Sequence, residues 1–407
     1  MTQALSLAYV CATLALVPFF LFMAAITIAA FVGPRKPTHL PSAFSARSRF
    51  LIVIPAHDEE GTIAATVRSC LGLNYDPSHY AIYVIADNCT DATAARAAEA
   101  GALVVERTDA TLRSKGHALE FFFTEIPEGN PTAGHDATVL IDADTVVDPN
   151  LLNVFDQTLG EGKDWIQGYY TVSNPDASWR TRMMTFAFSL ANGVWMLGMD
   201  RLGLGVGLKG NGMCFSSAGL RRIPWRAHGL VEDMEFALTL RAAGERVRFE
   251  PSARVYGEMV SRGGAGAASQ RRRWEAGRRS LRSKFAGLLF RSTVLGRYSR
   301  ACYIFDLFFP PLSTLALGLL LVSTVHVVAL PWAHLAGASR QLLPVHCVMV
   351  GILAAYAVSP ILVMGLPTSY LASLLALPYY MAWKIVVALG RTPRSWIRTP
   401  REPQAPA

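Results

Sequence analysis

Apolar and polar residues divide the chain into two apolar regions that flank a central region of alternating character. Residues 1–34 contain no charged side chain and are followed directly by Arg35 and Lys36. A segment of this length can cross a bilayer as a helix. It is too long for the apolar part of a signal peptide and lacks the basic start of one. The pattern therefore predicts an N-terminal transmembrane anchor over residues 1–34, with its basic flank on the cytoplasmic side.

The central region, residues 48–260, alternates short apolar runs of strand character with segments of helical periodicity. Strands that alternate with helices predict a parallel sheet with helices on both faces, and such sheets bind ligands at the carboxyl ends of their strands. Three runs end in polar clusters, HDEE at 57–60, DNCTD at 87–91 and DADT at 142–145. The predicted strands lie within 49–60, 80–91, 102–109, 138–145 and 164–172, and the predicted helices within 60–73, 91–102 and 115–126.

The C-terminal part is apolar again. No charged residue occurs over 307–330 or over 341–383. As a helix the second stretch would be about 64 Å long, which is too long for one crossing. It therefore predicts either two spans or one span with an interfacial helix. We expect a membrane region over 301–389 whose last segment, around 367–389, is interfacial or re-entrant, and a basic cytoplasmic tail over 390–407.

Composition agrees with a membrane protein that has a sizeable soluble part. The chain has 407 residues, of which 52% are hydrophobic, and a formal net charge of +8. Its mean hydropathy is +0.29 and its pI is about 9.3. The positive charge suits loops that face an anionic cytoplasmic leaflet, or a phosphate-rich substrate. Nucleic acid is not an expected partner, because no basic run is interleaved with aromatic residues. Six scattered cysteines without a CxxC pair predict free thiols in a reducing compartment.

Two carboxylates, Asp142 and Asp144, follow the buried apolar run 138–141. Residues two apart on a strand point the same way, so these two like charges would lie side by side and repel each other. A divalent cation that attracts both would resolve the conflict, because Mg²⁺ and Mn²⁺ prefer oxygen ligands. The spacing therefore predicts a metal site at the end of this strand.

Each of the four acidic or basic motifs has a simpler explanation when it is taken singly. A D-x-D occurs by chance in surface loops, and Asp87 could cap a helix that begins near Asp91. Glu232 and Asp233 would suit the start of any helix, and the basic segment 270–274 could lie on anionic lipid. Four such features in this order, on one domain between membrane segments, are poorly explained by chance.

In this combination the sequence resembles the membrane-integrated, inverting glycosyltransferases of family 2, the group of cellulose, hyaluronan, chitin-oligosaccharide and poly-N-acetylglucosamine synthases. The segment IPAHDEE is similar to the family's P-x-x-N-E-E strand end, and the resemblance covers roughly residues 48–280. It implies a GT-A type, Rossmann-like mixed α/β sheet flanked by transmembrane helices. The family pattern D, D-x-D, E-D, Q-x-x-R-W matches at Asp87, Asp142 with Asp144, Glu232 with Asp233, and Gln270-Arg271-Arg272-Arg273-Trp274.

The resemblance implies a nucleotide-sugar donor, with UDP-sugars as the expected class. Asp87 would accept a hydrogen bond from the uracil edge, Lys115 would offer its ammonium to the nucleotide, and Arg273 would clamp the diphosphate. Asp144, with Asp142 near it, would hold Mg²⁺ or Mn²⁺ against the diphosphate. The implied donor-binding residues are Pro55, His57, Glu59, Asp87, Lys115, Asp142 and Arg273.

The same resemblance assigns the catalytic and acceptor residues. Asp233, beside Glu232, would take the proton from the acceptor hydroxyl as it attacks the anomeric carbon from the opposite face, which inverts the linkage. Trp274 would stack on the acceptor sugar, and Gln270 and Asn211 are the other implied acceptor residues. Glycines at 210 and 212 would let backbone approach a ligand closely, or would simply form a tight turn.

Two departures from the family pattern and a short C-terminal region leave the product open. Asp58 stands where Asn is usual, and Val231 replaces a Thr common before E-D. Three functions are therefore carried forward. The first is a synthase of exopolysaccharide or cell-surface polysaccharide, acting with a growing glycan and with other synthesis or export proteins. The second is a transferase of one sugar to a membrane lipid, and the third is a non-catalytic nucleotide-binding scaffold. In each case we expect an integral protein of a bacterial inner membrane with a cytoplasmic catalytic domain, between an anchor over 1–34 and interfacial helices over 261–300.

Overall fold

The computed structural model describes residues 2–32, 47–131, 133–259, 265–329, 333–376 and 379. Within these ranges the side chains of 2–5, 265–271, 273, 274, 299, 329 and 333–339 are not described. The predicted basic tail over 390–407 and most of the predicted last membrane segment therefore lie outside the described residues.

An eight-stranded mixed sheet forms the centre of the region between the apolar segments, in the order β3-β2-β1-β4-β7-β6-β8-β5. The first half is parallel, with β1 between β2 and β4, whereas β7 runs antiparallel to both β4 and β6. The predicted α/β class is confirmed. The strands are β1 Phe50–Ala56, β2 Tyr80–Asp87, β3 Leu103–Arg107, β4 Ala137–Leu140, β5 Thr145–Val147, β6 Trp165–Val172, β7 Met213–Ser216 and β8 Arg248–Gly257.

The prediction that Asp142 and Asp144 lie at the end of one strand, with their side chains on the same side, is not what the structure shows. Strand β4 ends at Leu140 and β5 begins at Thr145, so Asp142 and Asp144 lie in the connection between the two strands. The strand ends early because β5 leaves β4 and pairs with the far strand β8. The two carboxylates are consequently set by a turn rather than by the pleat of one strand.

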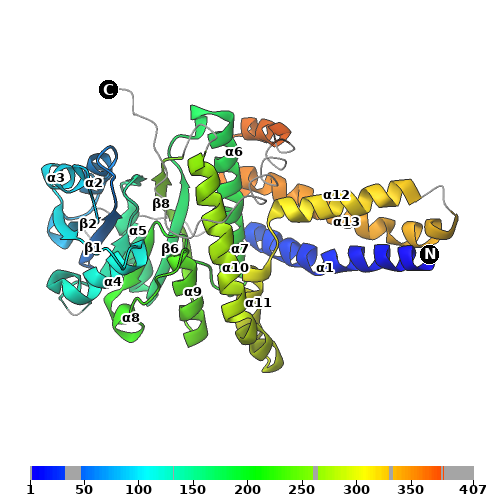
Figure 1. The fold of residues 1–407 in the computed structure, drawn as a ribbon, viewed down its shortest axis with the longest axis horizontal. Coiled ribbons are helices and arrows are strands. Elements are labelled where there is room, and N and C mark those ends of the chain that lie inside the picture. Colours follow the sequence, from blue (N-terminus) through cyan, green and yellow to red (C-terminus); the bar gives the residue numbers. More distant parts are fainter. Residues whose placement is uncertain are drawn as a thin grey trace.

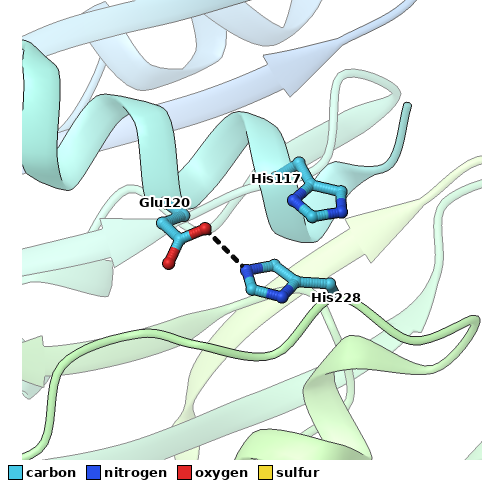
Figure 2. Close-up of side chains that lie close together, drawn as sticks. All are labelled: His117, Glu120 and His228. Atoms are coloured by element: carbon cyan, nitrogen blue, oxygen red, sulfur yellow. Dashed lines mark ion pairs between the residues drawn. The ribbon is translucent and has the colours of Figure 1, made fainter. Parts of the chain in front are cut away.

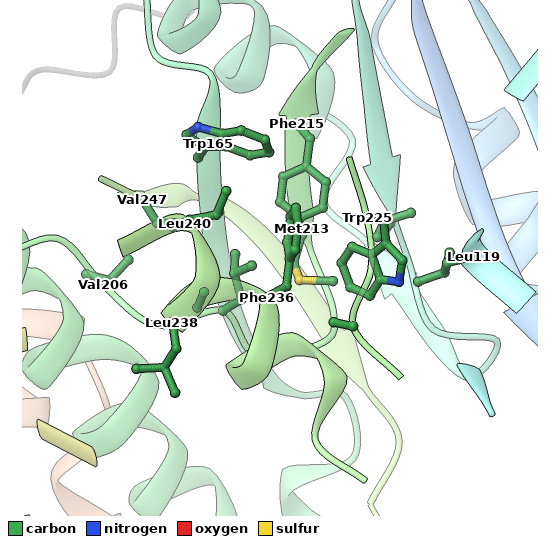
Figure 3. Close-up of a cluster of buried hydrophobic side chains, with 14 of the residues drawn as sticks. Leu119, Trp165, Val206, Met213, Phe215, Trp225, Phe236, Leu238, Leu240 and Val247 are labelled. Carbon is green, nitrogen blue, oxygen red and sulfur yellow. The ribbon is translucent and has the colours of Figure 1, made fainter. Parts of the chain in front are cut away.

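Helices cover both faces of the sheet (Figure 1). One hydrophobic core lies under α2 Ile63–Leu71, α3 Thr93–Glu99 and α5 Leu151–Gly160. The other core contains the aromatic cluster of Trp165, Phe215, Trp225 and Phe236, which Figure 3 shows between the sheet and α9. The helices that contribute to this second core include α4 Lys115–Glu125, α7 Trp195–Arg201, α9 Glu232–Ala243, α10 Ala265–Val294 and α11 Tyr298–Phe308.

The remaining helices complete the edges of this sheet region. Helix α6 Trp179–Phe188 continues through a π-helical turn, η4 Ser189–Val194, into α7, and α8 Ser217–Arg222 follows β7. The short 3-10 segments are η1 Pro77–His79, η2 Pro127–Gly129, η3 Pro175–Ala177 and η5 Thr368–Ala376.

Three long apolar helices extend away from the sheet side by side (Figure 1). They are α1 Thr2–Val32, α12 Leu312–Ala329 and α13 Ala333–Met364. Helices α1 and α13 are long and apolar enough to cross a membrane over Ser6–Val32 and Arg340–Met364. Helix α12 forms a third candidate span together with α11, from which it is bent by 73°. Their mutual contacts are filled by side chains such as Phe20, Met23 and Tyr356.

A close backbone contact fixes α4 against the segment that precedes α9. A Cβ atom on Gly116 would lie 2.0 Å from the carbonyl oxygen of Ala227 and 2.9 Å from the Cα of His228. The indole nitrogen of Trp225 donates to the carbonyl of Gly116 over 3.1 Å. Only glycine permits this approach, so α4 and residues 225–228 form one rigid unit.

We predict that Gly116→Ala lowers the free energy of unfolding by about 1–3 kcal/mol or more, because the added methyl group overlaps backbone that cannot move cheaply. The matched control is Gly287→Ala in α10, where an added Cβ meets nothing within 4 Å. That substitution should be neutral or stabilise by up to about 1 kcal/mol. Thermal unfolding of the detergent-purified protein measures both. Equal melting temperatures for the two variants would contradict the proposed close contact.

Candidate active site

Polar residues gather where β1, β2 and β4 reach their carboxyl ends. The connection after β1 and that after β2 are held together, because His57 Nδ1 donates to the carbonyl of Asp87 over 2.7 Å. Asp58 and Asn88 both have φ of 53°, the left-handed region that Asp and Asn adopt more readily than most residues. Asp58 accepts from the backbone N–H of Thr90 over 2.7 Å. Burial alone would raise the pKa of Asp58, but the hydrogen bonds from Thr90 outweigh burial and hold this pKa below its ordinary value.

Pro55 and Glu59, the other two predicted base and ribose residues of this segment, are partly exposed. Glu59 accepts from the hydroxyl of Thr62 over 3.2 Å, and its backbone N–H donates to Thr93 Oγ1 over 2.7 Å. Their placement beside His57 forms one rim at the end of β1. A role of this rim in binding a donor stays a prediction.

Asp87 pairs with Arg107, a residue that the sequence analysis did not identify. Arg107 Nη1 lies 2.6 Å from Asp87 Oδ1, and the two side chains are only 7% and 11% exposed. The residues stand opposite each other in the parallel register of β2 and β3. Arg107 also reaches Asp109 and the carbonyl of Leu112. The pair therefore holds the carboxylate of Asp87 in one fixed direction.

The ammonium group of Lys115 lies at the start of α4 and joins two other segments. It donates to Asp142 Oδ1, and to the carbonyl of Gly210 over 2.6 Å. Burial alone would lower the pKa of Lys115, but the negative charges of Asp142, Glu232 and Asp233 outweigh burial and raise this pKa above its ordinary value. Three predicted acidic residues thus act on the charge of Lys115.

Asp233 lies in the first turn of α9, next to this cation. A Cβ atom on Gly210, whose φ is +78°, would lie 3.3 Å from Asp233 Oδ2 and 3.7 Å from Lys115 Nζ. Burial raises the pKa of Asp233 above its ordinary value, although the N–H of Met234 and the charges of Lys115 and Lys209 act in the opposite direction. A carboxylate with a raised pKa is a better proton acceptor when it is ionised.

Lys209 is a second cation near this carboxylate, and the sequence analysis did not identify it. Its backbone N–H donates to the buried Gln167 over 2.8 Å. Burial lowers the pKa of Lys209 below its ordinary value, against the opposing effect of Asp306 and Asp233. Asp306 itself accepts from Trp195 over 2.9 Å. Lys209 therefore links the candidate site to α11, which precedes the bend toward α12.

Asn211 is fully buried, and its side chain is used inside the protein. Its Oδ1 atom accepts from the backbone N–H of Asp142 over 3.2 Å, and its Nδ2 atom donates to Thr145 Oγ1 over 2.8 Å. Its predicted contact with an acceptor stays a prediction. The bonds favour a positioning role, in which Asn211 fixes both ends of the turn that contains Asp142 and Asp144.

The turn that carries the two carboxylates has the donor set of a hard-cation site. Asp142 and Asp144 are both partly exposed, and Ala143 between them is buried. Because Lys115 already neutralises Asp142, a Mg²⁺ or Mn²⁺ ion would depend mainly on Asp144 and on phosphate oxygens of a ligand. The donor chemistry fits the predicted metal, and its binding remains a prediction.

The residues Gln270, Arg273 and Trp274 lie in α10, and their side chains are outside the described part of the structure. Two contacts hold this helix in place. A Cβ atom on Gly277 would lie 2.5 Å from a methyl group of Val231, which immediately precedes Glu232. Arg278 donates to three backbone carbonyls at the end of α11, those of Asp306, Leu307 and Phe309, over 2.6, 2.9 and 3.0 Å.

We predict that Arg107→Gln lowers the free energy of unfolding by about 3–5 kcal/mol, because it leaves the buried carboxylate of Asp87 without its cation. The double variant Asp87→Asn with Arg107→Gln should recover part of this loss. The control is Arg96→Gln, whose pair with Glu99 is 58% and 66% exposed and should cost at most about 0.5 kcal/mol. Chemical denaturation of the three proteins gives these values. An Arg107→Gln protein as stable as the Arg96→Gln protein would disprove the role of the buried pair.

Comparisons with solved structures relate this architecture to known enzymes. A mannosyltransferase from Pyrobaculum calidifontis in complex with GDP-Man and Mn²⁺ matches with a TM-score of 0.53 at 15% sequence identity, over 89% of this chain and 99% of that chain. A glucosyl-3-phosphoglycerate synthase from Mycobacterium tuberculosis matches 57% of this chain and 77% of its own, with a TM-score of 0.38 at 20% identity. TarS from S. aureus matches 52% of this chain and 37% of its own, with a TM-score of 0.36 at 15% identity.

No curated protein matches this chain. At these identities the first of the three structures shows a shared fold only, and the other two add no further argument. A family model described as "Glycosyltransferase like family 2" matches residues 47–277, which is more than half of the 407 residues and contains all of the described sheet. The chain thus has a Rossmann-like GT-A fold with flanking apolar helices, and it belongs to glycosyltransferase family 2.

Proposed function

We propose that the protein is a membrane-bound, inverting glycosyltransferase that takes a sugar from a nucleoside-diphosphate sugar and forms β-glycosidic bonds. The observation that carries this proposal is the convergence of Asp87, Lys115, Asp142 and Asp233 at one edge of the sheet. Lys115 donates to Asp142 and to the carbonyl of Gly210, and the carboxylate of Asp233 lies next to Gly210. The carboxyl edge of a largely parallel half-sheet is also where such folds bind nucleotides.

The donor would lie along the ends of β1 and β2. Asp87, oriented by Arg107, would accept a hydrogen bond from the base, with the rim of Pro55, His57 and Glu59 beside base and ribose. UDP-sugars are the first class to test. Lys115 would exchange part of its contact with Asp142 for a phosphate oxygen, a change that keeps an anion beside the ammonium. Arg273 would complete the diphosphate site from α10.

A divalent cation would be held by Asp144, with Asp142 near it, and would neutralise the charge that develops on the departing diphosphate. Asp142 is positioned for this task by the buried side chain of Asn211. The chain itself contributes a fixed turn that carries carboxylate oxygens and lies beside Lys115. The phosphate would therefore be contacted by the metal ion on one side and by the lysine on the other.

Asp233 would remove the proton from the acceptor hydroxyl, with Glu232 beside it. A single base and one direct displacement invert the anomeric centre. The raised pKa of Asp233 suits this role. Asp233 lies two residues after Val231, which packs on Gly277 of α10, and this suits an acceptor that enters from the helix side. Trp274 and Gln270 on α10 are proposed to contact that acceptor. No alternative base is needed for the reaction.

We propose that the apolar helices lie in a bacterial inner membrane, with the sheet domain in the cytoplasm. Two kinds of acceptor are compatible with this location. The first is a growing exopolysaccharide or cell-surface polysaccharide, to which sugars are added repeatedly. The second is a membrane lipid that receives one sugar. The mutual packing of α1, α12 and α13 favours the second, because the space between these helices is filled by side chains such as Phe20 and Met23.

We predict that Asp233→Asn lowers sugar transfer by roughly a hundredfold or more while donor affinity is retained, because a general base acts in the transition state and not in donor binding. Transfer is measured with a panel of labelled UDP- and GDP-sugars and membrane lipid extract, and affinity by calorimetry. The size of the labelled product separates polymer from glycolipid. A donor affinity that falls as much as transfer would place Asp233 in the donor site, and unimpaired transfer would refute the base. Absence of transfer by the unaltered protein with every donor would favour the scaffold.

A further prediction follows from the charges around Asp233. The acidic limb of log(kcat/KM) against pH reports ionisation of the base, and the positive charge of Lys209 favours the ionised carboxylate. Lys209→Met should raise the pKa of Asp233 further and move this limb to higher pH. Lys284→Met is the control, since Lys284 is 59% exposed and pairs with Glu235 instead. The base assignment fails if the limb stays in place or moves to lower pH in Lys209→Met.

A further inference from the structure

Two histidines and a glutamate come together on the side of α4 that faces the segment before α9 (Figure 2). His117 and Glu120 lie one helical turn apart on α4, and His228 comes from the facing segment. One ligand atom of each residue lies within 4.8 Å of the others. None of the three belongs to the candidate active site described above.

The two imidazole rings are stacked in parallel. Their centroids are 4.1 Å apart and the ring planes differ by 7°. The nitrogen lone pairs of an imidazole lie in the ring plane, so one of the two stacked rings has to turn before both can bind the same ion.

The contact between His228 and Glu120 is short but poorly aligned. His228 Nε2 lies 2.8 Å from Glu120 Oε2, yet this buried nitrogen makes no hydrogen bond of acceptable geometry within the described residues. A buried polar nitrogen without an aligned partner is unusual in a folded protein. A positively charged ligand between nitrogen and carboxylate would satisfy both atoms at once.

The backbone around this cluster is rigid. Gly116 contacts the backbone of Ala227 and His228, and Trp225 donates to the carbonyl of Gly116 over 3.1 Å. The three side chains therefore project from one fixed unit, which lowers the entropic cost of binding an ion. A tetrahedral ion with ligands at about 2.0–2.1 Å separates its ligand atoms by roughly 3.3 Å. Glu120 and His228 need to move apart by about half an ångström from their 2.8 Å separation, and one of the two imidazole rings has to turn out of the stack so that both face the ion.

We propose that His117, Glu120 and His228 form a binding site for a divalent transition-metal ion of the Zn²⁺ class, with water as the fourth ligand. Two imidazoles and one carboxylate are a ligand set that Zn²⁺ uses when one position stays open to solvent. Mg²⁺ and Mn²⁺ prefer sites made of oxygen, such as the turn with Asp142 and Asp144. The two sites would thus select different ions.

An ion at this site would strengthen the connection between two parts of the active site. Lys115 lies two residues before His117, and its ammonium contacts Asp142 and Gly210. His228 lies five residues before Asp233 on the other side of the cluster. Bound metal would therefore fix the lysine on the donor side relative to the proposed base. The proposal itself concerns metal binding and does not depend on the proposed reaction.

The test uses the full-length protein in detergent with excess Mg²⁺, which occupies oxygen-rich sites. Zn²⁺ binding is measured by calorimetry, and Co²⁺ serves as a spectroscopic probe, because four-coordinate Co²⁺ absorbs visible light. We expect one tight Zn²⁺ site, a rise of the melting temperature with Zn²⁺, and a Co²⁺ spectrum of nitrogen and oxygen ligands. His228→Gln and Glu120→Gln should each weaken binding at least tenfold and abolish the thermal shift.

Two control variants separate this site from others. His79→Gln removes a histidine that pairs with Asp76 on the surface, and Cys89→Ser removes the thiol of a second group formed with Asp58 and Asp91. Both should bind Zn²⁺ as the unaltered protein does. The proposal is overturned if the unaltered protein binds no Zn²⁺, if Glu120→Gln and His228→Gln bind it normally, or if the Co²⁺ spectrum shows thiolate ligands. Folding of each variant is checked by its melting temperature without metal.

Discussion

The ammonium group of Lys115 lies between the carboxylate of Asp142 and the carbonyl of Gly210, and the geometry of the site depends on it. Asp142, Glu232 and Asp233 come from two segments far apart in the sequence, and each acts on the charge of this lysine. Without the cation, three like charges would be crowded into a partly buried cleft, which is costly in a medium of low dielectric constant. The lysine therefore determines how closely the turn after β4 and the start of α9 can approach.

Glycines set the distances in this arrangement as much as charges do. Gly116 lets α4 contact the segment before α9, and Gly210 leaves room for Asp233 and Lys115 to face each other. Gly277 lets α10 pack on Val231. At Gly116 and Gly277 an added Cβ would overlap a neighbour, and at Gly210 it would make a tight contact in a backbone conformation, φ +78°, that other residues rarely adopt. The acidic residues can consequently keep fixed positions although they lie on segments joined by irregular loops, as preorganised charge in a catalytic site requires.

Much of the fold could be predicted from the sequence, because β-branched runs and helical periodicity are local signals. All five predicted strand runs contain a strand, and helices α2, α3, α4 and α9 begin close to where their patterns start. Strand β7 was missed because its four residues, MCFS, show no periodicity. Strand β8 was missed because Pro251 stands within it, and proline usually indicates a strand end or a bulge. The shortest strand, β5, was merged with β4 because the intervening turn is only four residues long.

Part of the candidate site could be predicted from residue type at strand ends, since Asp87 ends β2 and Asp142 and Asp144 follow β4. Lys115 and Asp233 begin helices and were predicted through the family resemblance. The partner of Asp87 could not be assigned, because pairing with Arg107 depends on the register of two strands, although a charged residue at the end of the run LVVER was a usable signal. Lys209 gave no signal, since its position comes from a glycine-rich loop fixed by Gln167. Asn211 was predicted only as an acceptor-binding residue, and its burial could not be predicted because burial is not visible in a loop sequence.

The hydrogen bonds from Arg278 to the last carbonyls of α11 have a practical consequence for work on the isolated sheet domain. Arg282 adds a further bond to Leu307 over 3.0 Å, so α10 is held to the chain that leads into the apolar bundle. A fragment that ended after residue 277 would lack these bonds, and one that ended after α10 would uncover Leu281 and Phe285, which are buried. Either fragment would expose apolar surface that favours aggregation, on the side from which the acceptor is proposed to enter. A water-soluble fragment that contains the sheet domain will therefore need a segment that replaces the contacts of α11, because truncation of the chain alone would leave them unmade.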